Sequence, residues 1–290
     1  MKNIFINTIP HSGTHLVSTI VESLGYEHAI ISNKFYSVKP YFRRKQKAGI
    51  NWRQSKEISN LFPSLEQKKV LVSVASPRLV RPSLIKNMLT KILDGQYVIG
   101  HMPYSDDGNK VLENHIAKTI TIIRDPRDMA ISMINHSRSR PLHHAHHYLF
   151  SKLSNESERL EAVLIGFKNK HGSLIGINQM YTSMLQWKKQ DNNLTIKFED
   201  LVGEKGGGSL SKQLTTIRTI TNHLELRDQI SDDMISDIAK NSFGVSGTFR
   251  KGKIGGWKST FTHKDIELYK ATISDLLVDV GYEPNKDWSN

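Results

Sequence analysis

The amino-acid sequence predicts a single α/β domain in which helices flank a central parallel β-sheet. Short apolar runs of strand length, rich in β-branched residues, alternate along the chain with segments whose apolar residues recur at helical spacing. This alternation is typical of a parallel sheet that is covered on both faces. The 290 residues contain no internal repeat and no linker-like break, so residues 1–290 are expected to form one domain.

Composition narrows the class of protein. Lys and Arg number 40 and Asp and Glu 28, and the net charge of +12 favours an anionic partner such as a nucleotide, an acidic glycan, nucleic acid or a membrane surface. The absence of Cys excludes disulfides, thiolate chemistry and Cys-based zinc sites. The N-terminal MKNIFINT is neither a secretory signal nor an anchor, and no stretch reaches the roughly 18 apolar residues of a spanning helix. The sequence therefore predicts a cytoplasmic protein without a membrane partner.

Residues 3–25 form the first expected strand–loop–helix unit. A strand at Ile4–Ile6 breaks at Pro10, and Gly25 stands where a left-handed C-cap belongs. The helix between them is indicated by apolar residues on one face, namely Leu16, Val17, Ile20, Val21 and Leu24.

The loop of this unit, His11-Ser12-Gly13-Thr14, has two interpretations. The first N–H groups of a helix lack internal partners and carry partial positive charge, so they bind a phosphate or sulfate group that a Gly allows to come close. The alternative is an ordinary strand-to-helix turn capped by Ser12 or Thr14. The chain contains no GxxxxGK[ST], so the loop is not a Walker A motif.

The middle of the chain is expected to continue the alternation after an irregular insertion. Residues 26–69 are polar with interleaved aromatics, and their basic run at 39–47 favours a solvated loop over a dedicated binding site. The remaining pattern predicts strands at 69–75, 97–101, 118–123 and 194–198 and helices at 83–93, after 126, and at 174–189. Residues 137–172 are polar and His-rich and give no strong strand signal.

The C-terminal part is expected to be mainly helical. Helices are predicted at 210–224 and 231–240, and a last helix follows a capping-box variant at 262–265. The loop at 203–209 contains Gly206-Gly207-Gly208, which follows no strand-to-helix pattern and is interpreted as a flexible loop. Residues 241–262 are rich in Gly and Lys and irregular.

Three segments carry candidate chemistry at one rim of the sheet. Ligands of parallel sheets bind at the carboxyl ends of the strands, which places His11 to His15, His101 and Arg124 together. In RDPRDMAIS, the Arg124 fork suits a phosphate and Ser132 can donate from the helix, although Arg124 could instead pair with Asp125 or Asp128. The segment FRKGKIGGWKSTFT, from residue 249 to 262, offers cations on flexible backbone that suit a loop closing over a polyanion.

These segments together resemble the cytosolic-type sulfotransferases, which use 3′-phosphoadenosine 5′-phosphosulfate (PAPS). IPHSGTHLV resembles their 5′-phosphosulfate loop, RDPRDMAIS their 3′-phosphate motif, RKGKIGGWKSTFT their C-terminal closing segment and KFEDLV their fourth-strand segment. All lie in the family's order between residues 3 and about 262. The resemblance implies a fold related to that of P-loop proteins and transfer of a sulfuryl group to an acceptor hydroxyl, with adenosine 3′,5′-bisphosphate (PAP) as product.

The resemblance also implies roles for individual residues. GHMPY is similar to the family motif that contains the general base, which would be His101. A His suits this role at neutral pH because its ordinary pKa is about 6.5. The 5′-phosphosulfate would be held by His11, Ser12, Gly13, Thr14 and His15, and the adenosine 3′-phosphate and adenine by Arg124, Ser132, Ser242, Phe243, Arg250, Lys251 and Gly252.

The chain departs from the family pattern at the loop. The family has Lys or Arg where this chain has His11, and that cation stabilises the bridging oxygen in the transition state. If a protonated His11 takes this catalytic role, the rate is expected to fall above pH ~7, and His11→Lys should remove the fall. Leu16 replaces a frequent Trp beside the adenine site, and Phe198 replaces a Tyr.

The histidines at 143–147 raise the question of a metal site. His143 and His147 have a zinc-like i, i+4 spacing, but no carboxylate or Cys lies nearby with ligand spacing, which favours a solvated or acceptor-facing loop and no metal. Two rival functions remain, a P-loop nucleotide kinase and a non-catalytic binder of acidic glycan or nucleic acid. The expected partner is a small-molecule or glycan hydroxyl acceptor rather than nucleic acid. The hydroxyl groups of a sugar, a phenol, a lipid alcohol and a natural-product scaffold all suit this role.

Overall fold

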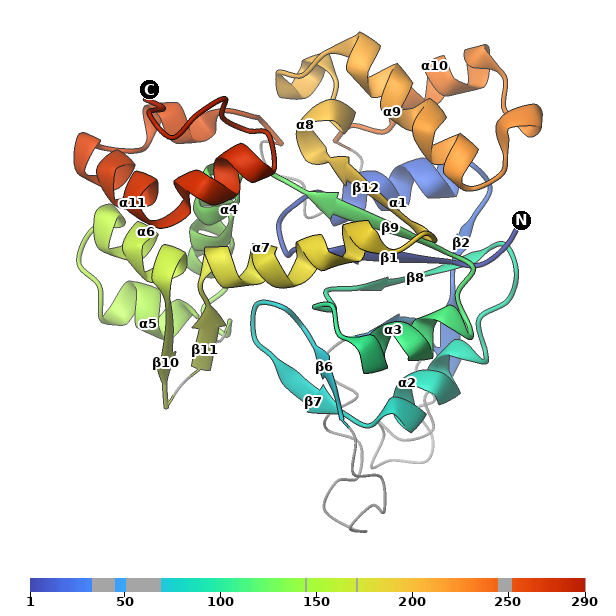
Figure 1. Ribbon diagram of the computed structural model, residues 1–290, viewed down its shortest axis with the longest axis horizontal. Helices are drawn as coiled ribbons and strands as arrows, with labels where there is room; N and C mark the ends of the chain where they lie inside the picture. Colours follow the sequence, from blue (N-terminus) through green and yellow to red (C-terminus); the bar gives the residue numbers. More distant parts are fainter. Residues whose placement is uncertain (33–44, 51–68, 144, 171, 245–251, 290) are drawn as a thin grey trace.

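The computed structural model describes residues 1–290 except 33–44, 51–68, 144, 171, 245–251 and 290. Its centre is a six-stranded parallel sheet in the order β12-β9-β1-β8-β2, with β5 also pairing with β8 (Figure 1). The strands of this sheet are β1 (Ile4–Thr8), β2 (Glu27–His28), β5 (Gly49–Ile50), β8 (Gln96–Gly100), β9 (Lys118–Ile123) and β12 (Asn193–Lys197). The predicted α/β fold with a central parallel sheet is confirmed.

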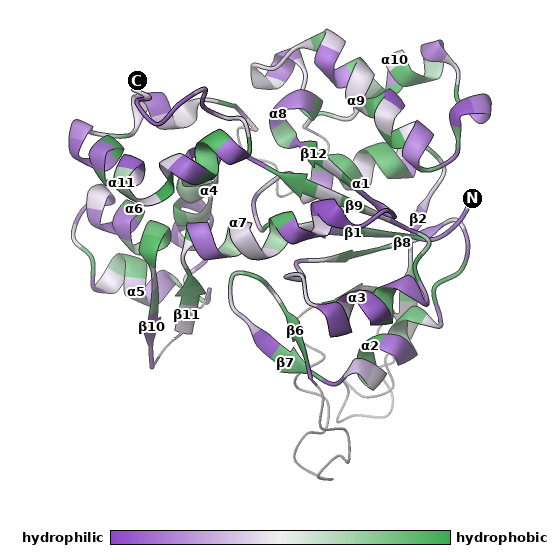
Figure 2. Ribbon diagram, viewed as in Figure 1, coloured by the Kyte–Doolittle hydropathy of each residue, from purple (hydrophilic) through white to green (hydrophobic). Residues whose placement is uncertain are grey.

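The sheet separates two apolar cores because successive residues of a strand point to opposite faces. Ile4 and Ile6 of β1 belong to one core and Phe5 to the other. The first core is completed by α1 (Thr14–Ser23), α9 (Leu210–His223) and α10 (Asp232–Asn241). The strands at the centre are richer in apolar residues than the helices, which carry polar outer faces (Figure 2), as expected of strands that are buried on both sides.

The second core is covered by the remaining long helices. Buried residues on all of them contribute to it. They are α2 (Pro82–Leu89), α3 (Asp106–Glu113), α4 (Pro126–Arg138), α6 (Glu156–Ile165), α7 (Ile177–Leu185) and α11 (His263–Asp279). The short helices are α5 (His146–Ser151) and α8 (Phe198–Leu201), with 3₁₀ turns η2 (Gln186–Lys189), η3 (Glu204–Gly206), η4 (Arg227–Gln229) and η5 (Gly256–Ser259).

Helix ends follow the sequence signals closely. Gly25, one residue beyond the C-cap of α1, has φ 95°, a conformation that Gly adopts without a Cβ penalty. Thr262 and Asp265 form the predicted capping box before α11. None of the helices in the described part of the chain is both long enough and apolar enough to cross a membrane.

Three expectations about the elements need correction. The run at 69–75 contributes only β6 (Val70–Val72), which pairs antiparallel with β7 (Arg78–Val80) outside the central sheet. The His-rich stretch 137–172 contains α5 and α6 and opens the hairpin of β10 (Gly166–Asn169) and β11 (Gly172–Ile175), so α7 starts later than expected. The insertion supplies β2 and β5 to the main sheet and β3 (Ile30–Ser32) paired with β4 (Lys45–Lys47). Strands of two to four residues are too short to show periodicity.

Candidate active site

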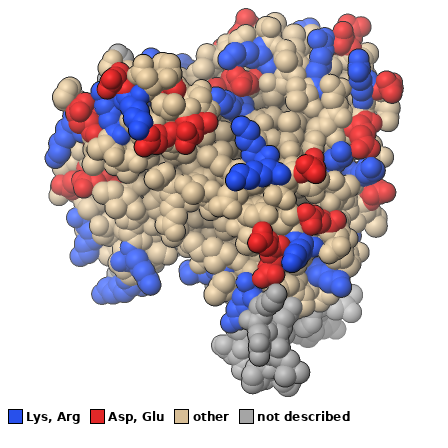
Figure 3. Space-filling model, viewed as in Figure 1, with Lys and Arg blue, Asp and Glu red and all other residues tan. Residues whose placement is uncertain are grey.

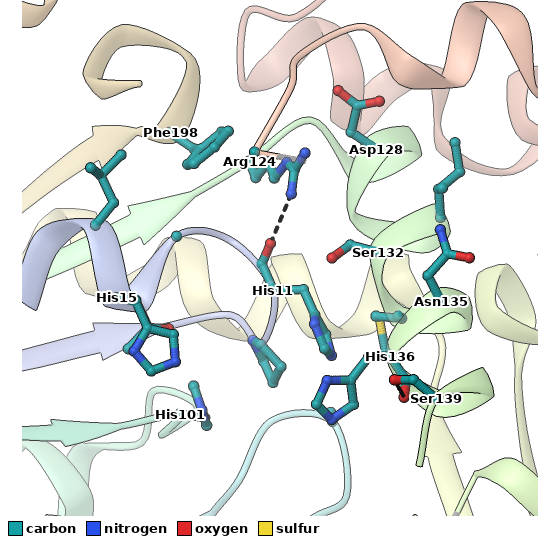
Figure 4. Close-up of a pocket in the computed structure, with 18 of the residues that line it drawn as sticks. His11, His15, His101, Arg124, Asp128, Ser132, Asn135, His136, Ser139 and Phe198 are labelled. Atoms are coloured by element: carbon teal, nitrogen blue, oxygen red, sulfur yellow. Dashed lines mark hydrogen bonds between the residues drawn. The ribbon is translucent and has the colours of Figure 1, made fainter. Parts of the chain in front are cut away.

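One cavity of about 1330 Å³ lies at the carboxyl ends of the central strands. His101 and Arg124, each directly following a strand, line it together with the loop after β1. Helix α4 lines it along its length, from Asp128 through Ser132 to Ser139 (Figure 4). We call the part around the β1–α1 loop and Arg124 the loop end. The part that we call the far arm is lined by Ser73 and Ser76 of the β6–β7 connection and Arg78 at the start of β7. At and beyond the end of α4 it is lined by His136, Arg138, Arg140 and His143.

The loop end has the backbone geometry of an anion cradle. His11 has φ 71° and Gly13 φ 107°, so the chain turns through left-handed conformations before α1 begins at Thr14. No side chain caps the first turn of α1 and no acidic residue lies in it. Its N–H groups and the positive end of its dipole are thus available to an anion in the cavity. The alternative of a turn capped by Ser12 or Thr14 is not realised.

Among the predicted loop residues, His11, Gly13, Thr14 and His15 line the cavity and Ser12 does not. The Ser12 hydroxyl is buried and donates to the carbonyls of Ile9 (2.5 Å) and Ile122 (3.0 Å). It therefore ties the loop to β9 from behind. A direct contact of its side chain with a ligand would require these bonds to break.

His101 is held by the strand that precedes the loop. Its Nδ1 lies 2.8 Å from the carbonyl oxygen of Thr8 and 2.9 Å from the Thr8 hydroxyl, which in turn lies 2.8 Å from the Thr14 hydroxyl. A carbonyl can only accept, so Nδ1 carries the hydrogen and the neutral ring leaves Nε2 unprotonated. Burial is the main reason that the pKa of His101 lies below its ordinary value, so the neutral form prevails at pH 7.

The side chain of Asn7, on β1, binds the backbone of Met102, just beyond the end of β8. Its amide donates to the carbonyl of Met102 (3.0 Å) and accepts from the N–H of the same residue (2.8 Å). The side chain is fully buried, where an unpaired amide would be costly. Residues on both sides of His101 are thus fixed to β1.

Arg124 joins the loop to the C-terminal segment. Its guanidinium donates to the carbonyl of His11 (3.3 Å) and to that of Lys253 (2.8 Å), and its Cζ lies 4.5 Å from the centre of the Phe198 ring (Figure 4). Its Nε is buried and has no hydrogen-bond partner among the described residues.

The predicted alternative, an ion pair of Arg124 with a neighbouring carboxylate, is not realised. Asp125 pairs instead with Arg127 (2.7 Å), and Asp128 accepts from the N–H groups of Gly255 (2.7 Å) and Trp257 (2.9 Å). Arg124 therefore brings a positive charge and an unused donor to the loop end. Ser132, two turns into α4, lines the same region.

The C-terminal segment is anchored by groups that sequence reasoning missed. Besides the two bonds to Asp128, Ile254 N–H donates to the carbonyl of Gly206 (3.1 Å). A Cβ on Gly206 would lie 2.7 Å from the carbonyl oxygen of Gly252. The glycines interpreted as a flexible loop thus form the surface on which this segment packs. The repeated glycines were the sequence signal for this packing, because glycine allows close approach of another backbone as well as flexibility.

The predicted nucleotide residues near this segment are only partly described. Ser242, Phe243 and Gly252 line the cavity, whereas Arg250 and Lys251 lie outside the described residues. Besides His11, the chain departs from the family pattern at Leu16 and Phe198, and both of these residues line the cavity.

His11 differs from the expectation in its charge. Burial, followed by the nearby His136, His101, His143 and Arg124, holds the pKa of His11 well below its ordinary value. Without a bound anion, His11 is therefore neutral at pH 7. The predicted fall in rate above pH ~7 has to lie at lower pH, unless an anion bound beside His11 raises its pKa again.

Of the clustered histidines at 143–147 that the structure describes, one lines the cavity. His143 lines the far arm, and its ring meets that of His136 at 5.2 Å between centroids. Helix α5 begins only at His146, so His143 and His147 do not share a helix and the zinc-like spacing has no structural basis. The described residues contain no group of three or more His, Asp or Glu arranged to hold a metal ion. Sequence reasoning missed His136, because only packing reveals its contact with His11.

Comparisons with known proteins agree with this architecture. A crystal structure of mouse sulfotransferase SULT7A1 complexed with PAP is similar with a TM-score of 0.58 and 19% identity, covering 97% of this chain and 87% of that one. Retinol dehydratase, solved with androsterone and the inactive cofactor PAP and also with retinol and PAP, gives a TM-score of 0.52 at 17% identity in each case, covering 96% of this chain and 82% of that one. No curated protein matches the sequence. At these identities the likeness shows the fold.

The family itself is shown by the sequence profile of the sulfotransferase domain, which matches residues 1–281. The match spans the loop, the strand ends, α4 and the C-terminal segment that surround the cavity. The chain belongs to the sulfotransferase-domain family and is a sulfotransferase.

Proposed function

We propose that this sulfotransferase moves the sulfuryl group of PAPS to the hydroxyl of an acceptor and that His101 is the general base. The observation that carries the proposal is the hydrogen bond from His101 Nδ1 to the Thr8 carbonyl. It fixes the tautomer and leaves Nε2 as the proton acceptor. The same strand, β1, leads directly into the anion cradle, so base and cradle share one support.

The residues of the loop end suit the donor. The uncapped N-terminus of α1 fits the 5′-phosphosulfate. Ser132 and Arg124, whose Nε has no partner within the described parts of the chain, fit the 3′-phosphate. Phe243 fits an adenine ring by stacking. When bound, PAPS supplies the sulfuryl group and leaves as PAP, the ligand named in the titles of the similar solved structures.

The chain's own groups then carry the proton and the charge. His101 Nε2 takes the proton of the acceptor hydroxyl as the acceptor oxygen forms its bond to sulfur. The bond from sulfur to the phosphate oxygen breaks in the same step, and the electron pair stays on that oxygen. The N–H groups at the start of α1 stabilise the charge there, and His11 can donate a hydrogen bond whether neutral or protonated.

A ligand comparison tests the proposal against its rivals. PAP without metal should raise the melting temperature of the protein, because a ligand that binds only the native state stabilises it. Stabilisation only by ATP with Mg²⁺ would overturn the proposal in favour of a kinase. Stabilisation by neither ligand would favour the non-catalytic binder.

The surface charge gives no support to nucleic-acid binding. On the face shown in Figure 3, Lys and Arg are interspersed with Asp and Glu and form no continuous basic stripe.

The acceptor class extends this proposal. The solved retinol dehydratase complexes contain androsterone and retinol, which are small molecules with a hydroxyl group. We propose a small-molecule or glycan hydroxyl acceptor for this chain. Incubation with labelled PAPS and a metabolite extract, followed by identification of the labelled product, tests it directly.

A further inference from the structure

The far arm adjoins the proposed base. Within the β6–β7 connection, Val74 N–H donates to the carbonyl of His101 (2.6 Å), and the Ala75 carbonyl accepts from Ile175 N–H (2.9 Å). These bonds hold Ser73, Ser76 and Arg78 at the edge of the cavity beside His101. A molecule in the far arm can therefore present a group to Nε2 while the rest of it lies along this connection.

Imidazole rings line the opposite wall. The ring of His11 meets that of His136 at 4.8 Å between centroids, and His136 meets His143 at 5.2 Å, both edge to face. Figure 4 shows His11 pointing toward His136 below Arg124. The three rings form a continuous row from the loop end into the far arm. Each ring can donate a hydrogen bond when neutral and carries a full charge when protonated.

The rim of the far arm is basic. Arg78, Arg138 and Arg140 are exposed there. Arg138 pairs with Glu156 (2.6 Å), whereas Arg78 and Arg140 form no ion pair with any residue that the structure describes. No Asp or Glu is among the described residues that line this arm.

The negative and positive side chains that line the cavity therefore lie in different parts of it. Asp128 is the one carboxylate along the described lining, and it lies at the loop end, bonded to the C-terminal segment. Apolar surface beside these groups includes Met133, one turn before His136 on α4, and Leu174, whose neighbour Ile175 bonds to Ala75. A wholly apolar acceptor that covered Arg78 and Arg140 would desolvate guanidinium groups that have no ion-pair partner among the described residues, and it would offer them no charge in return.

We propose that the far arm binds acceptors that carry an anionic group in addition to the hydroxyl. The apolar part of the acceptor packs on Met133 and Leu174, and its carboxylate, phosphate or sulfate lies between the His136–His143 pair and the guanidinium groups of Arg78 and Arg140. This inference rests on the proposed sulfuryl transfer, because it treats the far arm as the acceptor site.

Three molecules of the same shape and different charge test the inference. They are 4-hydroxyphenylacetate (anionic), tyrosol (neutral) and tyramine (cationic), each titrated calorimetrically into PAP-saturated protein. A charge-assisted hydrogen bond is worth about 1.5–3 kcal/mol, so the anionic compound should bind at least about tenfold more tightly than tyrosol, with tyramine weakest. Equal affinities, the reverse order or no binding of 4-hydroxyphenylacetate would overturn the inference.

Paired variants locate the effect. Arg78→Gln with Arg140→Gln should abolish the preference for the anionic compound while PAP binding and tyrosol binding stay as in the parent. Arg227→Gln removes an exposed charge on η4, which does not line the cavity, and should preserve the preference. A preference that survives the double variant would contradict the assigned subsite. Failure of PAP itself to bind would instead refute the proposed function, so the two failures are distinguishable.

Discussion

The two parts of the cavity are built differently. The loop end is made mostly of backbone at the carboxyl ends of parallel strands, namely the turn after β1, the start of α1 and the carbonyls that bind Arg124. The far arm is made of side chains from the β6–β7 connection and the end of α4, which lie about sixty residues apart in the chain. Backbone geometry suits an invariant phosphate, and side chains suit a variable acceptor. Damage to the loop end should therefore impair stability and nucleotide binding, and damage to the far arm should change selectivity.

The largest expected effect is at the boundary between the two parts. His101→Ala removes the proposed base and should lower turnover about 10²- to 10⁴-fold while PAP still binds. The matched control is His223→Ala, which removes a His that also contacts a strand carbonyl, that of Thr119, but does not line the cavity. Near-normal turnover of His101→Ala would place the base elsewhere.

The pH profile of the parent enzyme gives a second readout of His101. A base must be neutral to act, and the pKa of this His is lowered by burial. The rate should therefore rise with pH through an apparent pKa below 6.5 and stay level near pH 7–8. A rising limb centred above pH 7 would contradict the assignment.

Next in size is the steric effect at the turn before α1. In Gly13→Ala, the new Cβ would lie 2.6 Å from the Phe198 ring at a left-handed φ, and the free energy of unfolding should fall by roughly 2–4 kcal/mol. Gly255→Ala is the control, because Gly255 also has positive φ but has nothing within 4 Å of its Cβ position. It should lose only about 1 kcal/mol in urea unfolding. Equal losses would show that sterics do not define the cradle.

A smaller effect is expected where the C-terminal segment is anchored. Asp128→Asn keeps one acceptor oxygen but loses the negative charge and the second acceptor oxygen, so one of the two N–H groups of the segment loses its partner. PAP should therefore bind about 10- to 100-fold more weakly. The control is Asp232→Asn. Asp232 forms an exposed ion pair with Arg218 of α9, and neither residue lines the cavity, so this variant should bind PAP as the parent does. Unchanged affinity in Asp128→Asn would mean that the segment's position does not affect the nucleotide.

The smallest effect concerns a carboxyl behind the loop end. Glu199 accepts from Asp125 N–H (2.8 Å) and from the Tyr282 hydroxyl (2.8 Å), and burial raises its pKa from 4.5 to about 7. The folded protein thus holds a proton that the unfolded chain has lost, and stability should decline as pH rises from about 4.5 through 7. Glu199→Gln should remove this slope and gain roughly 1–2 kcal/mol at pH 8. The exposed Glu204→Gln should leave the unfolding curve between pH 5 and 8 as in the parent.

The same contrast explains what the sequence could predict. β1, β9 and α1 were predicted because their patterns are local and long enough to show a period, and the loop motif is contiguous. The row of His11, His136 and His143 was not, because it depends on how α4 packs against the loop. Gly206 was misinterpreted for a related reason: its partner, Gly252, lies far along the chain. Functional sites formed by residues that are neighbours in the sequence can be predicted from it, whereas sites formed by the packing of distant segments cannot.

The Asn7 amide has a consequence for how such an enzyme can diversify. Thr8 fixes the imidazole of His101 and Asn7 fixes the backbone of Met102, so β1 orients the proposed base relative to the phosphate loop. The β6–β7 connection adds only a backbone bond, from Val74 N–H to the His101 carbonyl. Side-chain substitutions in the connection after β6 and at the end of α4 leave these β1 contacts and the Val74 backbone bond in place. Related enzymes that keep β1 can therefore change acceptor by substitutions in one wall of the cavity while the geometry of proton transfer stays the same.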